Sequence, residues 1–240
     1  ILLLCCMVLT LLPTTVLAAD GPMDTIPKYD VSIDVYNRTS DISIKDSRSY
    51  YIYSSVPDKL RDTWAWDKKI FIKGDKTAPH VFIDGVNIKM SPSSKGPAIE
   101  LNKKASAYLY FIGKDSTLQG ADGRAAIQKN RSEGQLYVLA RTGTTVTCKG
   151  GYRAAGIGGS WAIRNIGDSM FNMDMYGHGV NMHFGSQSNP DYWGGTINAT
   201  GGEYGAGIGA GSWGHSGYSG NTIHGGAGER LYFYSGTVNA

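Results

Sequence analysis

Five side chains capable of acid–base chemistry are concentrated in one stretch of this 240-residue sequence, residues 160–193. They are Asp168, Asp174, His178, His183 and Asp191. Hydrolysis of a glycosidic bond needs two carboxyl groups flanking the bond, one acting as acid and the other as base or nucleophile. The three aspartates are scattered, and their spacing places no two of them as such a pair. The pattern alone therefore predicts no hydrolytic site.

A short motif offers a second route to catalysis. Gly177-His178-Gly179 matches one of four motifs that polygalacturonases carry on a right-handed β-helix, but the full set, with Asn-x-Asp, Asp-Asp and Arg-x-Lys in order, is not found. A pectate-lyase-like reaction would need clustered aspartates for calcium beside a basic residue, for which Arg153 and Arg164 are available. We expect a non-catalytic protein. The alternative is a β-helix polysaccharide-degrading enzyme, with Asp174 and His178 as the catalytic candidates.

The sequence offers no convincing set of metal ligands. Residues 225–231 read G-G-A-G-E-R-L, close to the calcium nonapeptide Gly-Gly-x-Gly-x-Asp-x, but Arg230 stands where the ligating aspartate belongs. His178 and His183 are five residues apart in sequence that is not helical. We therefore expect neither a metal site nor a cofactor.

Aromatic residues offer a different chemistry, because sugar rings stack on exposed tryptophan and tyrosine faces. Several lie in or beside segments rich in glycine, where they could project outward. The candidates for ligand binding are Trp161, Tyr176, Tyr192, Trp193 and Trp213. The competing interpretation is that the aromatic residues cover the flank of the fold or cap its N-terminal end, where Trp64 and Trp66 alternate with Ala65.

A repeated segment indicates which elements position these residues. Residues 145–158 and 196–209 share seven identical positions, including the glycine pair near the middle and the Ala-Gly-Ile-Gly end. The isoleucine of the Ala-Gly-Ile-Gly segment, Ile157 in the first copy and Ile208 in the second, also has counterparts upstream at Ile99 and Ile127. The intervals between the four isoleucines are 28, 30 and 51 residues. Such internal periodicity is typical of stacked repeat architectures.

Short β-type runs separate the glycine-rich corners. They cover residues 81–83, 108–112, 136–140 and 231–234, and no stretch beyond the N-terminus keeps an amphipathic helical period. The sequence therefore predicts an all-β parallel β-helix, or β-solenoid, with coils of roughly 28–30 residues. The four isoleucines should form one inward column. The 51-residue interval should hold one coil plus a protruding insertion at 160–193.

The N-terminal region indicates export. Residues 1–18 form an uncharged apolar segment with a small-residue cleavage pattern, which predicts a secretory signal peptide cut after Ala18 and no membrane span in the mature chain. Residues 19–75 are expected to hold a capping region and the first strands, and residues 76–240 the repeats. Cys148 is the one cysteine left after cleavage and aligns with Ala199, which predicts a small buried filler.

The charges argue against a nucleic-acid partner. Residues 1–149 carry 20 basic and 15 acidic side chains, whereas residues 150–240 carry three arginines, five acids and no lysine. No cluster of five or more basic residues occurs, so a solvated face is favoured over a patch for polyanions.

The segments H-V-F-I-D-G-V-N-I at 80–88 and G-P-A-I-E-L at 96–101, with the two corners ending in Gly-Ile-Gly, carry a family resemblance. From about Asp41 onward the chain resembles the glycine-rich, carbohydrate-binding-domain-containing repeat proteins of anaerobic, mostly Gram-positive bacteria. The resemblance implies a right-handed parallel β-helix on a secreted or wall-attached protein, with anchoring modules further along. Residues 160–193 depart from that pattern.

Together these features predict a bacterial protein, secreted or on the cell surface. It would act as an adhesin, a stalk or a glycan-binding scaffold, with an extracellular glycan or the cell wall as partner. Because the sequence starts at Ile1 and stops within a repeat, we expect further modules in the same polypeptide.

Overall fold

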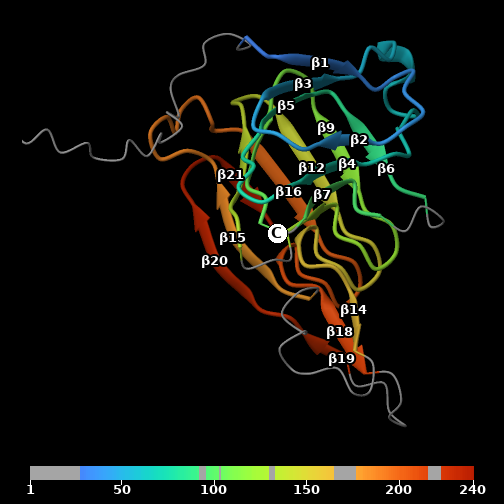
Figure 1. Cartoon of the computed structure of the whole chain (residues 1–240), viewed down its shortest axis with the longest axis vertical. Coiled ribbons are helices and arrows are strands. Elements are labelled where there is room, and N and C mark those ends of the chain that lie inside the picture. The colour runs from blue at the N-terminus through green and yellow to red at the C-terminus, as the bar shows by residue number, and fades with distance from the viewer. Residues whose placement is uncertain (1–27, 92–95, 103, 130–132, 165–176, 216–222) are drawn as a thin grey trace, which may run out of the picture.

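The chain winds into a parallel β-helix (Figure 1), as the sequence predicts. The structure is a computed structural model that describes residues 28–91, 96–102, 104–129, 133–164, 177–215 and 223–240. The expected signal peptide lies outside these ranges. Each full coil contributes one strand to each of three parallel sheets, which we call sheets A, B and C.

Sheet A has seven strands, in spatial order β1 (Val31–Asp34), β3 (Ser49–Tyr53), β5 (His80–Asp84), β8 (Ala107–Phe111), β11 (Leu136–Ala140), β15 (Gly179–Phe184) and β20 (Gly228–Phe233). Sheet B has six: β2 (Ile42–Ile44), β4 (Ile70–Lys73), β7 (Ile99–Asn102), β10 (Ile127–Gln128), β13 (Ile157–Gly158) and β17 (Ile208–Gly209). Sheet C has five: β6 (Asn87–Lys89), β9 (Ser116–Gln119), β12 (Thr145–Lys149), β16 (Thr196–Thr200) and β21 (Thr237–Asn239).

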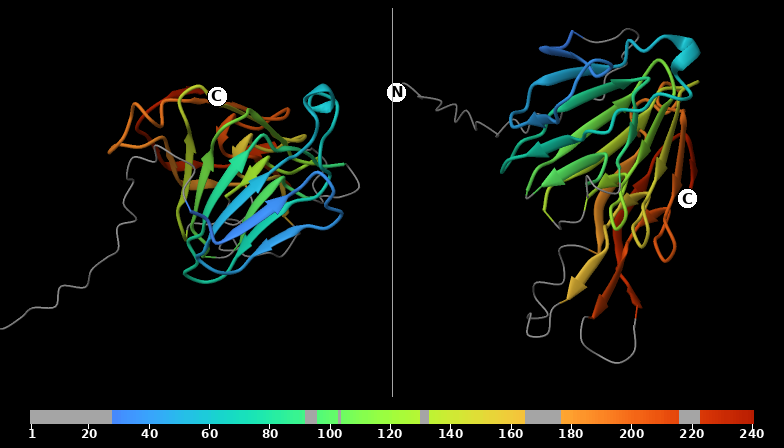
Figure 2. Two further views of the ribbon diagram at one scale, coloured as in Figure 1. Left: turned by 90° about the horizontal axis from the view of Figure 1, so that it is seen from above. Right: turned by 90° about the vertical axis from the view of Figure 1, so that its right-hand side faces the viewer.

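A small fourth sheet lies apart from the three main ones. It consists of β14 (Ala162–Arg164), β18 (Ser212–His215) and β19 (Ile223–Gly225), and in Figure 2 it projects beyond one end of the stacked coils. β14 pairs with β18 in parallel, and β18 pairs with β19 antiparallel.

The predicted isoleucine column is confirmed. Ile99, Ile127, Ile157 and Ile208 are direct neighbours in successive strands of sheet B, and the first three are fully buried. Each buried isoleucine stabilises the fold by about 1.5–3 kcal/mol. Because β13 pairs directly with β17, the 51-residue interval holds one coil plus inserted residues, as expected.

The same column continues toward the N-terminus. Ile42 pairs with Ile70, which pairs with Ile99, so β2 and β4 belong to the regular stack. Trp66 is 3% exposed, bridges to Ile88 of β6 and donates its indole N–H to the Arg38 carbonyl at 2.7 Å. The coils therefore extend over residues that lack the glycine-rich corners of the repeat.

The insertion is shorter than the range 160–193 expected from the sequence. β15 lies inside that range and is a regular strand of sheet A, with Met182 and Phe184 fully buried. The added residues therefore lie on either side of β15, at 160–178 and 186–193. The polar Asn181 and His183 concealed this strand from pattern analysis.

Cys148 is fully buried, as predicted, and lies between Leu118 and Ala199 of the neighbouring coils. Burial raises the pKa of its thiol far above the usual range. A thiol that stays protonated and inaccessible is not a nucleophile.

The repeated glycines allow the corners of adjacent coils to approach closely. A Cβ on Gly151 would lie 1.9 Å from the Ala121 carbonyl oxygen, and one on Gly202 would lie 2.0 Å from the Gly151 oxygen. The glycine-rich motif is thus a consequence of backbone-to-backbone stacking.

Candidate ligand-binding surface

A continuous stack of rings runs along the outer face of sheet A. We call it the aromatic row; it comprises His80, Tyr108, Tyr137, His183 and Tyr232. Neighbouring ring centroids are 4.7, 4.5, 4.4 and 4.7 Å apart. The row forms because the five residues share one register position in consecutive parallel strands.

Two histidines anchor the row by the same arrangement, three coils apart. His80 stacks on Tyr108, and its Nδ1 lies 3.0 Å from the Tyr110 hydroxyl. His183 stacks on Tyr232, and its Nδ1 lies 3.1 Å from the Tyr234 hydroxyl. Each imidazole is thus fixed by a ring contact and a hydrogen bond.

The environment of His183 favours the neutral imidazole. Burial lowers the pKa of His183. Its Nε2 lies 2.8 Å from the Gln135 side-chain oxygen, so the bonds are satisfied when Nε2 carries the proton and Nδ1 accepts from Tyr234. The ring is held in place by stacking and by these two hydrogen bonds.

Most ring faces in the row are covered by the neighbouring rings, so chiefly ring edges reach the solvent. The exception is β20, where Tyr232 is 43% and Tyr234 40% exposed. These two rings are inclined by 3° with centroids 6.4 Å apart. Both stack on His183, so they form one flat two-ring surface.

A groove of about 510 Å³ lies beside the C-terminal part of the row. Its lining comes from three successive coils and consists of Gly134, Gln135, Tyr137, Asn181, His183, Arg230 and Tyr232. The strands that carry most of these residues, β11, β15 and β20, pair side by side, and β15 and β20 are visible together in Figure 1. We refer to this cavity as the sheet A groove.

Two residues reach the groove through an unusual backbone conformation. Asn181 and Arg230 occupy matching places in β15 and β20, with φ of 57° and 53°. The left-handed conformation is sterically unfavourable for residues other than glycine, and strain of this type concentrates at functional sites. The backbone thus departs from regular β geometry where two polar side chains line the groove.

A buried amine adds positive charge near the groove. Lys129 is 1% exposed, and its ammonium group donates to the Glu133 carbonyl oxygen at 2.9 Å. Burial lowers the pKa of Lys129 to about 8, and the positive charge of Arg230 contributes to this shift. The negative charge of Glu133 acts in the opposite direction and offsets part of it. The lining itself contains one arginine and no carboxylate.

The interpretation of Trp193 as an exposed binding residue is wrong. Trp193 is 2% exposed, and its ring contacts Tyr110 at 5.2 Å and Tyr192 at 4.9 Å between centroids. Residues 186–193 fold back over sheet A, where Thr142 holds them by accepting and donating hydrogen bonds at Asp191, Tyr192 and Gly194. Trp193 and the half-buried Tyr192 therefore cover a secondary core.

Trp161 lies in a separate cluster at a corner of the coils. The Arg153 guanidinium carbon lies 5.3 Å from the Trp161 ring centroid, 4.8 Å from that of Tyr152 and 6.0 Å from that of Tyr204. Tyr152 and Tyr204 are 42% and 56% exposed. The sequence analysis did not single out these two tyrosines. The repeat offered a signal for one of them: Tyr204 precedes Ile208 by four residues, the same position that Arg153 takes before Ile157.

Of the two catalytic candidates, Asp174 and His178, only His178 lies in the described part of the chain. His178 Nδ1 accepts a hydrogen bond from the Ala227 amide at 3.1 Å, and His183 belongs to the aromatic row. Asp168, Asp174 and Tyr176 lie outside the described residues, as do the side chains of Arg164 and Trp213. Within the described ranges, no three His, Cys, Asp or Glu side chains are grouped to hold a metal ion.

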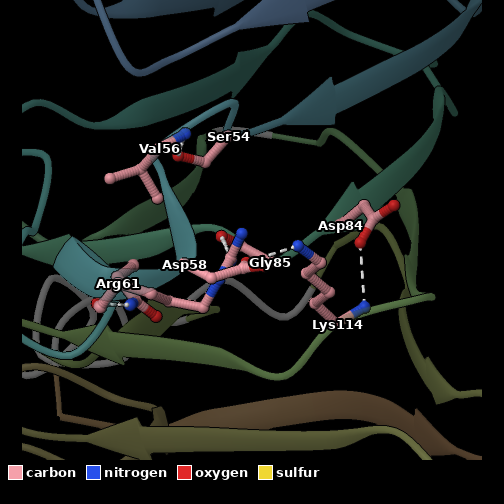
Figure 3. Close-up of polar contacts among 8 residues, drawn as sticks. Ser54, Val56, Asp58, Arg61, Asp84, Gly85 and Lys114 are labelled. Carbon is pink, nitrogen blue, oxygen red and sulfur yellow. Dashed lines mark hydrogen bonds and ion pairs between the residues drawn. The ribbon is translucent and has the colours of Figure 1, made fainter.

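Charged residues also meet at an N-terminal corner, shown in Figure 3. The Lys114 ammonium pairs with Asp58 at 2.8 Å, while its amide donates to Asp84 at 2.8 Å. The Arg61 guanidinium donates to the Gly85 carbonyl at 3.0 Å. These contacts clamp the short 3-10 helix η1 (Asp58–Leu60) onto the adjacent turns, so the cluster is structural.

No helix in the described part of the chain is long and apolar enough to cross a membrane. Neither a protein-family model, nor a curated protein, nor a solved structure matches the chain. Function must therefore be argued from the chemistry of the sheet A groove itself.

Proposed function

We propose that this protein is a secreted or cell-surface, non-catalytic β-helix that binds a glycan in the sheet A groove. The observation that carries the proposal is the lining of this groove, in which amide, guanidinium and phenol groups from three coils converge. Ligand sites typically combine a concave surface with a few convergent polar groups.

The groups in the groove suit the chemistry of sugars. Gln135 and Asn181 bring side-chain amides to the groove, and the amide group has both donors and an acceptor, as sugar hydroxyls do. Tyr232 adds exposed apolar ring surface for the C–H groups of a sugar, whereas Tyr137, stacked on both sides, offers only its ring edge. Because the β-helix holds these side chains in a stacked array, little conformational entropy is lost when a ligand binds.

The alternative of a polysaccharide-degrading enzyme finds no support in this groove. Glycoside hydrolysis requires two carboxyl groups at the bond, and the lining contains none. Binding without turnover is therefore the expected behaviour, in keeping with an adhesin or a scaffold.

Screening the purified protein against a panel of extracellular glycans, followed by calorimetry on the best ligand, tests the proposal. Gln135→Ala should weaken binding by roughly fivefold, because a lost hydrogen bond to a ligand costs about 1 kcal/mol. Gln119→Ala removes the same side chain from the outer face of sheet C and should leave affinity unchanged. Release of reducing or unsaturated sugar would instead establish the enzyme, and Gln135→Ala binding as tightly as the parent would remove the groove from the proposal.

A further inference from the structure

We propose that the sheet A groove selects an acidic sugar, a uronate whose carboxylate is held by Arg230. This inference rests on the proposed glycan-binding function and specifies its ligand. It follows from the placement of charge around the groove.

Arg230 is positioned to receive an anion. It lies on β20 in a left-handed conformation, lines the groove and is exposed to solvent. Among the described residues, no acidic side chain forms an ion pair with it, whereas Arg48 and Arg61 pair with Asp46 and Asp58. A guanidinium group binds a planar carboxylate through two parallel hydrogen bonds, which is its preferred geometry.

Lys129 is a second cation, close enough to Arg230 for the two charges to interact. The charge of Arg230 disfavours protonation of Lys129, so the two cations repel one another. The Glu133 carboxylate favours protonation of Lys129 and so opposes the effect of Arg230. Glu133 is itself exposed and forms an ion pair with the exposed Lys104 at 3.3 Å. His183, the other titratable group in the lining besides the tyrosines, is held neutral. A bound carboxylate would relieve the repulsion between the two cations.

The charge is local and does not come from a generally basic surface. Residues 150–240, which supply Asn181, His183, Arg230 and Tyr232, carry three arginines against five acids. Non-specific attraction of a polyanion is therefore weak over this part of the chain. Selectivity must come from groups within the groove, where Arg230 lies beside the side chains of Gln135 and Asn181.

The direct test compares hexagalacturonate with its fully methyl-esterified form by calorimetry on the whole protein, in EDTA at low salt. The acid should bind at least tenfold more tightly than the ester. Arg230→Gln should abolish this preference, and Arg230→Lys should retain part of it, because lysine supplies charge without the bidentate geometry. Arg153→Gln, at a left-handed arginine in the separate corner cluster, is the matched control and should keep the preference.

Proton uptake on binding is a second readout. It distinguishes a ligand carboxylate bound near Lys129 from a loss of affinity caused only by structural damage in the Arg230 variants. Binding of the acid near pH 8 should be accompanied by proton uptake, detected by repeating the titration in buffers of different ionisation enthalpy. Lys129→Met should bind without that uptake. The ester should cause none in the parent protein.

The outcomes separate the two proposals. If the ester or a neutral glycan binds as tightly as the acid, or if Arg230→Gln keeps the preference, the selectivity is overturned while glycan binding stands. A sulfated oligosaccharide that binds as tightly as hexagalacturonate would overturn the assignment to a uronate. If no glycan binds at all, the proposed function fails, and this inference fails with it.

Discussion

The burial of a single side chain in this chain differs from one coil to the next and determines how much that residue contributes to stability. Ile157 is fully buried in the middle of its column, whereas Ile208, the same residue type one coil later, is only partly buried. Lys129 is almost completely buried but carries a charge that its surroundings disfavour. Substitutions at these three residues therefore test how burial and charge contribute to the free energy of unfolding.

The isoleucine column predicts a graded loss of stability. Ile157→Ala should lower the free energy of unfolding by about 2–5 kcal/mol, because it leaves a cavity between two stacked isoleucines. Ile208→Ala should cost clearly less, since part of that side chain already contacts solvent. Urea unfolding followed by circular dichroism measures both, and equal losses would contradict the assigned register.

Lys129 predicts a specific dependence of stability on pH. The folded pKa of about 8 lies below the ordinary value of 10.5, so the unfolded chain binds more protons between these pH values. Stability should therefore rise with pH across that interval, and the full penalty of about 3 kcal/mol is present below pH 8. Lys129→Met should be more stable than the parent at pH 7, with the difference shrinking toward pH 10.5. A difference that stays constant across this range would show that Lys129 titrates normally in the folded protein.

At the scale of the elements, the sheets were predictable wherever one local rule repeats. The recurring isoleucine identifies four of the sheet B strands, β7, β10, β13 and β17, and glycines mark the places where corners stack. β15 was not recognised, because the polar Asn181 and His183 interrupt its apolar pattern. His183 belongs to the aromatic row, and Asn181 lines the groove. The burial of Trp193 could not be read from sequence, since it depends on residues 186–193 folding back over strands distant in the chain.

The glycine corners predict contrasting effects of the same substitution. Gly202→Ala would place a Cβ 2.0 Å from the Gly151 oxygen, so the coils must separate and the protein should lose several kcal/mol or fail to fold. Gly143 has φ of 83°, and a Cβ added there would meet no atom within 4 Å, so Gly143→Ala should cost only about 1 kcal/mol of backbone strain. Thermal unfolding and the yield of soluble protein compare the two. A Gly202→Ala variant as stable as Gly143→Ala would mean that the corners are not packed against each other.

The whole molecule is a one-dimensional stack in which each coil contacts chiefly its neighbours, so stability is set locally. The groove joins three successive coils through β11, β15 and β20, while the first coils take no part in it. β20 is among the most exposed strands described, with Leu231 as its one partly buried residue. The coil that contributes Arg230 and Tyr232 to the groove is therefore expected to open most readily.

Ligand binding should consequently protect the coils unevenly. At a ligand concentration of 100 times Kd, binding lowers the population of any opened state that cannot bind by about 2.7 kcal/mol. Opening of β20 dismantles the groove, so amide hydrogen exchange in residues 228–233 should slow about 100-fold on addition of hexagalacturonate. Exchange in β3 and β5 should be unchanged, because these strands can open without disturbing the groove. Hydrogen exchange followed by mass spectrometry resolves these segments, with Arg230→Gln as the control, in which the same ligand concentration should slow exchange about tenfold less. Uniform slowing along the chain would mean that the coils open as a single unit, and protection confined to β3 and β5 would place the ligand on the opposite end of the stack.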